Sequence, residues 1–209
     1  FISTDKAVNP TSIMGATKRV SENLLKCFDN EKTKFISVRF GNVLESRGSV
    51  IPIFKEQIKN GRPVTITHPE MKRYLMSITE AVQLVLQAGE MGKGGEVFVL
   101  DMGNPVKILD LAREMIRLSG LEPDKDIPIV FTGKRPGEKL FEEILTAEEG
   151  TVTSSHEKIL IAKKTDNLGP EYIEKVETLI KAARDNLGRE KIITLLKNVV
   201  PTYQPESIQ

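Results

Sequence analysis

The start of the chain places an acid and an amine side by side. Asp5 and Lys6 follow Ser3 and Thr4, at the point where a short strand is expected to end. Ligands of open α/β sheets bind beyond the carboxyl ends of the strands, so this is a favourable position for catalysis. A carboxyl group and an amine can serve opposite halves of a proton transfer when their surroundings separate their pKa values. From these residues alone, the alternative is a solvated ion pair on the surface.

A second group of polar side chains suits the binding of a phosphorylated ligand. Arg135 and Glu138 occur in the loop 133–138, which reads GKRPGE. A guanidinium can make two parallel hydrogen bonds to a phosphate, and a carboxylate can accept hydrogen bonds from ribose hydroxyls. Taken singly, Arg135 is equally well explained as a solvated loop charge.

Alternating strand and helix patterns surround these groups. Residues 1–3 read as a strand tip, the run 9–12 (NPTS) supplies helix-start residues, and a helix is expected over 13–28. A segment rich in β-formers follows over 34–40, and this strand, helix, strand order predicts an α/β fold with a parallel sheet. Further helices are expected over 49–60, 77–88, 108–118, 170–186 and 189–199, and further strands over 64–67, 97–100 and 127–131.

The helix expected over 13–28 carries one partly apolar face. Met14 and Lys18 lie four residues apart and therefore share a side of this helix. Arg19 and Glu22 are among the charged residues that separate its apolar positions, which are Met14, Ala16, Val20, Leu24 and Leu25.

Composition excludes several classes of protein. The 209 residues include 30 Lys and Arg against 29 Asp and Glu, a formal net charge of +1, which argues against nucleic acid as the main partner. The single cysteine, Cys27, excludes an intramolecular disulfide. With only two histidines, far apart in sequence, no metal site is expected. No apolar run approaches the roughly 18 residues of a membrane span, so no membrane segment is expected in this chain.

Five short motifs occur together in one order. They are residues 3–7 (STDKA), the pair Met14 and Lys18, 39–43 (RFGNV), 46–50 (SRGSV) and 135–139 (RPGEK). This set resembles the CapD-like polysaccharide-biosynthesis nucleotide-sugar 4,6-dehydratases of the extended short-chain dehydrogenase/reductase superfamily. Several motifs matching together are more specific than any one of them.

The resemblance implies a domain plan. It covers residues 1–149, which would hold the C-terminal half of a Rossmann-like domain interleaved with a smaller nucleotide-sugar-binding subdomain. Residues 150–209 carry no such motif and are expected to form a C-terminal strand and a helical extension.

The activity implied is that of a UDP-N-acetylhexosamine (UDP-GlcNAc) 4,6-dehydratase, a lyase that makes a 4-keto-6-deoxy sugar nucleotide for polysaccharide or glycan biosynthesis. By the same resemblance, Lys6 removes the proton from C5 of the sugar and Asp5 protonates the departing C6 hydroxyl. Met14 stands where the family normally has a tyrosine base, and a thioether cannot accept a proton at neutral pH. Thr4, a water molecule or Asp5 could take over that step. The alternatives are a C5 or C4 epimerase, or a non-catalytic UDP-sugar-binding module.

The resemblance also assigns residues to the ligands. Lys18 would hold the nicotinamide ribose, with Ser3 beside the cofactor. Asn42 would contact the sugar diphosphate, and Arg73, Arg135 and Glu138 the phosphates and ribose. The uracil pocket would be walled by Ser49, Val50, Thr65, Ile66 and Thr67. Taken singly, residues 65–67 are more simply explained as a strand.

A dinucleotide fold needs a glycine-rich turn after its first strand, and no GxGxxG occurs here. We therefore expect NAD, favoured over NADP, to be bound mainly by a segment upstream of Phe1, and the chain alone to be inactive. A cytoplasmic protein is expected, or one on the cytoplasmic face of the inner membrane if that upstream segment carries an anchor. A homo-oligomer is also expected. The apolar face of helix 13–28 is a candidate contact surface, although burial within the monomer explains it equally well.

Overall fold

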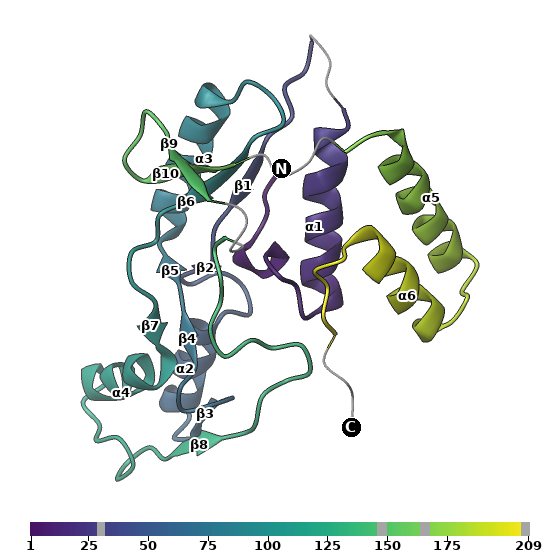
Figure 1. Cartoon of the computed structure of the whole chain (residues 1–209). Helices are drawn as coiled ribbons and strands as arrows, with labels where there is room; N and C mark the ends of the chain where they lie inside the picture. The colour runs from purple at the N-terminus through teal and green to yellow at the C-terminus, as the bar shows by residue number, and fades with distance from the viewer. Residues whose placement is uncertain (29–31, 146–149, 164–167, 206–209) are drawn as a thin grey trace. The chain divides into compact units, whose positions relative to one another are not determined.

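The computed structural model describes residues 1–28, 32–145, 150–163 and 168–205 (Figure 1). They divide into two compact units that alternate along the chain. The first unit comprises Phe1–Phe40, Leu84–Asp101 and Glu143–Gln209, and the second Gly41–Gln83 and Met102–Glu142. The domain boundary expected at 149/150 adjoins residues 146–149, which lie outside the described residues.

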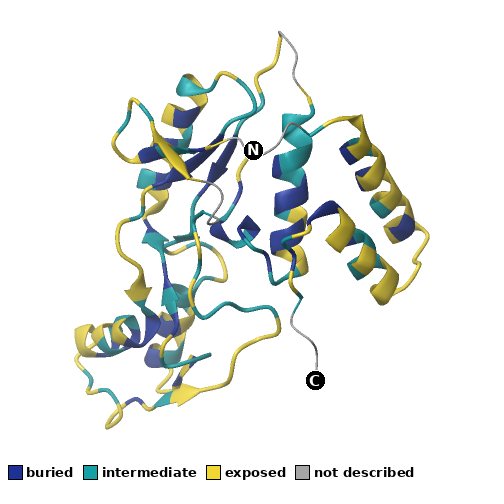
Figure 2. Ribbon diagram, viewed as in Figure 1, coloured by how far each residue is buried: buried dark blue, intermediate teal, exposed yellow. Residues whose placement is uncertain are grey.

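The first unit is built on a four-stranded sheet with the order β1-β6-β10-β9. Strands β1 (Ser37–Arg39) and β6 (Val97–Leu100) are parallel, whereas β10 (Ile159–Ala162) is antiparallel to both β6 and β9 (Thr151–Thr153). Strands β1 and β6 are buried along their whole length (Figure 2). Parallel strands with both faces covered favour such continuous apolar runs as Val97–Leu100.

Helix α1 (Ile13–Lys26) connects two parallel segments of this unit. Ile2 forms a parallel bridge with Val38 of β1, so the expected strand, helix, strand unit of an α/β fold is confirmed. The helix begins where the Ser12 hydroxyl accepts a hydrogen bond from the Gly15 amide at 3.1 Å. Such N-caps satisfy a main-chain donor that the first helical turn leaves unpaired. The segment Asp5–Ala7, between Ile2 and α1, forms a short 3₁₀ helix, η1.

The apolar face of α1 is covered by the C-terminal helices α5 (Pro170–Arg184) and α6 (Arg189–Val199). Figure 1 shows the two helices packed as a pair alongside α1. The structure therefore accounts for this face by burial within the chain, which was one of the two explanations the sequence left open. The shared cluster contains Ala16, Val20, Tyr172, Val176, Leu196, Val199, Val200 and Tyr203.

The second unit has its own small core. Helices α2 (Val50–Lys59) and α4 (Ile108–Leu118) pack on the parallel strands β3 (Val64–Ile66) and β8 (Ile129–Phe131). Two short pairings complete it, β2 (Asn42–Val43) with β5 (Leu75–Met76) and β4 (Lys72–Arg73) with β7 (Val106–Lys107). The core residues are Phe54, Ile58, Val64, Ile66, Met71, Ile108, Leu109, Ala112, Ile116 and Ile127.

Helix α3 (Ile78–Met91) continues from the second unit into the first along the chain. Among the described residues, no helix has the length and apolar character needed to span a bilayer. The limits expected for the helices 108–118 and 189–199 and for the strand 97–100 agree with the structure, and the other expected helices and strands differ by one to three residues at one or both ends.

Candidate functional site

The first candidate group lies where the strand segment around Ile2 ends. Asp5 begins η1, and its amide donates a hydrogen bond of 3.2 Å to the carbonyl of Phe40, the residue that follows β1. The Thr4 hydroxyl caps η1 by accepting from the amide of Lys6. Together these two hydrogen bonds hold residues 4–6 at the carboxyl end of the strands, the edge at which α/β sheets bind ligands.

The Asp5 carboxyl group is buried and only partly satisfied. It is 1% exposed, and its Oδ1 accepts hydrogen bonds from Thr4 Oγ1 and Lys6 Nζ, each at 2.9 Å. Its Oδ2 is also buried but has no hydrogen-bond partner among the described residues. Because an unsatisfied buried oxygen costs free energy, native proteins retain one mainly where it has a task. Asp5 is therefore not part of a solvated surface pair.

Met14 and Lys18 lie on the exposed side of α1, next to the same strand. The Lys18 ammonium donates a hydrogen bond of 2.9 Å to the carbonyl of Ile2 and lies 4.7 Å from the centre of the Phe1 ring. Met14 is 48% exposed, so its thioether is accessible at the surface of this unit.

Ser3 differs from its neighbours in the direction of its side chain. The residue is 4% exposed, and its hydroxyl donates a hydrogen bond of 2.5 Å to Glu22 Oε1 in α1. The hydroxyl is therefore engaged inside the unit, and the expected role of Ser3 at the cofactor stays a prediction.

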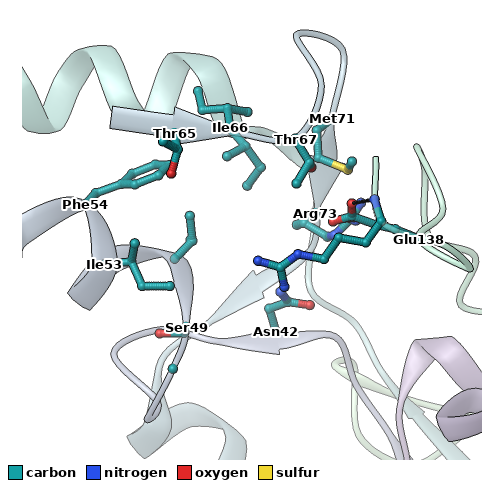
Figure 3. A pocket seen from close by; sticks show the side chains of 14 residues that line it. Asn42, Ser49, Ile53, Phe54, Thr65, Ile66, Thr67, Met71, Arg73 and Glu138 are labelled. Carbon is teal, nitrogen blue, oxygen red and sulfur yellow. Dashed lines mark hydrogen bonds and ion pairs between the residues drawn. The ribbon is translucent and has the colours of Figure 1, made fainter. Parts of the chain in front are cut away.

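A pocket of about 250 Å³ lies within the second unit (Figure 3). All nine residues expected to bind substrate line it, although they come from five separate stretches of the sequence. Their role as ligands of the substrate stays a prediction. The nine are Asn42, Ser49, Val50, Thr65, Ile66, Thr67, Arg73, Arg135 and Glu138.

One part of this pocket is apolar. Figure 3 shows Thr65 and Ile66 of β3, with Thr67 just after it, facing Ile53 and Phe54 of α2 across the opening. Sequence reasoning missed Ile53 and Phe54, although they follow Val50 at helical spacing and so share its face. The pocket can therefore hold a flat, partly apolar group between a strand and a helix.

Ser49 and Thr65 each bring a hydroxyl group to this apolar part. The Ser49 Oγ at the start of α2 is buried and has no hydrogen-bond partner among the described residues. The Thr65 hydroxyl accepts from Gln57 Nε2 at 2.9 Å, and Gln57 Oε1 accepts from the Thr65 amide. Ser49 is thus available to a ligand, whereas Thr65 is fixed by Gln57.

The other end of the pocket is charged. Arg73 Nη2 lies 3.3 Å from Glu138 Oε1, and the other oxygen of Glu138 accepts a hydrogen bond from the Arg135 amide at 3.1 Å. The Arg135 guanidinium itself has no hydrogen-bond or ion-pair partner among the described residues. An unpaired guanidinium beside a pocket suits an anion such as phosphate.

Comparison with known proteins shows what this chain is similar to. Residues 1–164 match the model of a family described as "Polysaccharide biosynthesis protein". The capsular polysaccharide biosynthesis protein CapD of Staphylococcus aureus is 56% identical over 197 residues, which are 93% of this chain and 32% of CapD. A UDP-glucose 4-epimerase of Rickettsia bellii is 41% identical over 152 residues, covering 71% of this chain and 43% of the epimerase.

A solved structure supports the same relationship. Pen from Bacillus thuringiensis superposes with a TM-score of 0.71 at 36% identity, covering 79% of this chain and 52% of Pen. The chain thus spans between about a third and a half of the length of these relatives.

Proposed function

Because this chain belongs to the polysaccharide biosynthesis protein family, within the extended short-chain dehydrogenases/reductases, we propose that it supplies the acid–base residues and the nucleotide pocket of a UDP-N-acetylhexosamine 4,6-dehydratase. UDP-GlcNAc is the proposed substrate. The observation that carries the proposal is the buried Asp5 carboxyl group, which is bonded to Lys6 and has one oxygen with no hydrogen-bond partner among the described residues. As the chain spans about a third of CapD, the activity is proposed for the complete protein that contains it.

The chemistry proposed for the first unit is the elimination of water from the sugar. Lys6 Nζ takes the proton from C5, which a ketone at C4 has made acidic. Asp5, in its protonated form, gives its proton to the C6 hydroxyl, which leaves as water, and Lys6 reacts as the neutral amine. The 2.9 Å contact between Asp5 Oδ1 and Lys6 Nζ holds the acid and the base as one unit. General acid–base assistance of this kind is typically worth about 10²–10⁴-fold in rate.

The proposed cofactor is a nicotinamide dinucleotide, NAD in preference to NADP. When bound, it supplies a reversible hydride acceptor, so the reaction involves no net oxidation. The chain offers a partial fit, because the Lys18 ammonium sits at the strand end and the accessible Met14 lies one turn before it on the same face. Lys18 would bind a ribose hydroxyl.

The chemistry proposed for the second unit is nucleotide binding. The uracil would lie between β3 and the apolar residues Ile53 and Phe54 of α2, with the buried Ser49 hydroxyl as a hydrogen-bond partner. Arg135 would bind the diphosphate through its unpaired guanidinium. Glu138 would accept hydrogen bonds from ribose hydroxyls, because each carboxylate oxygen has a second lone pair.

An epimerase is the second candidate, and the 41% identity to a UDP-glucose 4-epimerase favours it. Against it stands Met14, at the position where the family normally has a tyrosine that takes the proton of the 4-hydroxyl. Asp5 and Lys6 both remain, which favours elimination over a lost activity.

The test is the mass of the product. The complete protein is incubated with UDP-GlcNAc and NAD without a reductant, and the sugar nucleotide is analysed by mass spectrometry. A product lighter by one water supports the dehydratase. An unchanged mass with altered stereochemistry would establish an epimerase, and an unaltered substrate that nevertheless binds would leave a binding module.

A further inference from the structure

We propose that helix α1 positions the Asp5–Lys6 pair at two points, with Glu22 holding Ser3, two residues before Asp5, and Gly15 packing against the main chain of Lys6. The inference rests on the proposed function in taking Asp5 and Lys6 as the reacting groups. It adds two positioning residues, neither of which needs to touch the substrate.

Glu22 is the centre of a buried polar cluster. It is completely buried, and its Oε1 accepts hydrogen bonds from Ser3 Oγ at 2.5 Å and from Arg39 Nε at 2.7 Å. Its Oε2 accepts from Arg39 Nη2 at 2.6 Å and lies 3.4 Å from Arg19 Nη1. One carboxylate thus joins a strand end, a neighbouring strand and its own helix. Charge-assisted bonds in a site of low dielectric constant are strong and directional.

This cluster helps to fix the course of the main chain that leads to Asp5. The Ser3 amide donates to the carbonyl of Val38 at 2.8 Å, and the Asp5 amide donates to that of Phe40 at 3.2 Å. Arg39 lies between these two acceptors, and its guanidinium is held by Glu22. The main chain of residues 3–5 is therefore held by β1, and the Ser3 side chain by α1, so a shift of Ser3 would be passed on to Asp5.

Gly15 provides the second support. A Cβ atom built on it would lie 2.2 Å from the carbonyl oxygen of Lys6 and 3.2 Å from Pro10 Cβ. The first distance is closer than a real Cβ atom allows, so the main chain of α1 packs directly against that of Lys6. Any side chain at position 15 would push Lys6 or the helix away. Together, Gly15 and Glu22 hold both ends of the segment that contains the acid and the base.

The test uses two variants and two matched controls in the complete protein. Ser3→Ala removes the hydroxyl that reaches Glu22, and Gly15→Ala introduces the obstructing methyl. The control for the first is Ser37→Ala, which removes another buried serine hydroxyl, in β1. The control for the second is Gly89→Ala in α3, where a Cβ would meet nothing within 4 Å.

We expect kcat to fall by about tenfold to a hundredfold in Ser3→Ala and Gly15→Ala, because small misplacements of reacting groups are costly. The comparison is made well below the melting temperature of every variant. The KM for UDP-GlcNAc should stay within about twofold, since the pocket residues all belong to the second unit. The KM for NAD should stay within the same range, since the Ser3 hydroxyl is bonded to Glu22 in the interior of the first unit. The pH profile of kcat should also shift, because the Asp5–Lys6 contact is altered. Both controls should retain the kcat and pH profile of the unaltered protein.

Several results would overturn the inference. Unchanged kcat and pH profile in folded Ser3→Ala would show that the cluster only stabilises the fold, even if Gly15→Ala does not fold. A raised KM for NAD in Ser3→Ala would make Ser3 a cofactor contact instead. Failure of the proposed function would give a different result: Asp5→Asn and Lys6→Ala would then retain normal turnover.

Discussion

Arg73 and Glu138 form an ion pair across 65 residues of sequence, at one end of the pocket in the second unit. Arg73 also donates to the carbonyl oxygens of Lys72 and Leu140, at 2.7 and 3.3 Å, and its Nε lies 3.8 Å from Glu142 Oε1. It thus ties β4 to the segment 138–142. Arg135 has no such structural role.

The two arginines should therefore respond differently to removal. We expect Arg135→Ala to weaken UDP binding by about tenfold to a hundredfold, because it removes a hydrogen bond to a charged group. The melting temperature should not change. Arg73→Ala should lower both the affinity and the melting temperature. Titration calorimetry and thermal denaturation of the 209-residue chain measure the two quantities. Arg62→Ala, at an exposed arginine outside the pocket, is the control. Unchanged UDP affinity in Arg135→Ala would remove this arginine from the site.

Asp5 and Lys6 should be required for turnover but not for nucleotide binding. In the complete protein, Asp5→Asn and Lys6→Ala should each reduce kcat by about 10²–10⁴-fold, because each removes one partner of the proton transfer. UDP affinity should not change. Lys125→Ala, which removes the lysine of a solvated pair with Glu122, is the matched control. Normal turnover in both variants would refute the acid–base assignment.

The sequence predicted those helices and strands in which apolar residues recur at a regular spacing. Helix α4 could be placed because Leu109, Ala112 and Ile116 repeat at helical spacing and are all buried. The two-residue strands, such as Asn42–Val43, are too short to show a repeating pattern of apolar residues. Only their pairing with distant residues defines them. The domain plan and the activity came from the resemblance of several motifs, not from periodicity.

Side-chain direction was the main information that the sequence lacked. Glu22 reads as a charged residue between apolar positions, yet it is completely buried because Arg39 and Ser3 surround it. This contact depends on how α1 packs against β1, which no local pattern encodes. For the same reason the sequence could place Ser3 at the carboxyl end of a strand but could not show that its hydroxyl faces the interior.

The buried pair of Arg39 and Glu22 should be costly to break. We expect Arg39→Met to lower the free energy of unfolding by about 3–5 kcal/mol, because it leaves the Glu22 carboxylate buried with its main partner gone. Glu114→Ala, which breaks the exposed pair with Arg117, should cost at most about 1 kcal/mol. Urea unfolding of the two variants, compared with the unaltered chain, gives both values. Equal small losses would mean that the buried pair adds little to stability.

Tyr172 should make the stability of the first unit sensitive to high pH. Burial among α1, α5 and α6 raises the pKa of its hydroxyl to about 12, and the side chain of Asn23 partly offsets this effect. The folded state therefore keeps the proton more tightly than the unfolded state, whose tyrosine ionises near pH 10. The stabilising contribution is complete below pH 10 and is lost as the pH rises towards 12.

Tyr172→Phe should remove this part of the pH dependence, because phenylalanine does not ionise. Urea unfolding at pH 8, 10 and 11 should show a steeper decline in the free energy of unfolding for the unaltered chain than for the variant. Tyr74→Phe, at a tyrosine of the second unit that is only half-buried, is the control and should keep the steeper decline. Parallel declines in Tyr172→Phe and the unaltered chain would show that the pKa of Tyr172 is the same in the folded and the unfolded state.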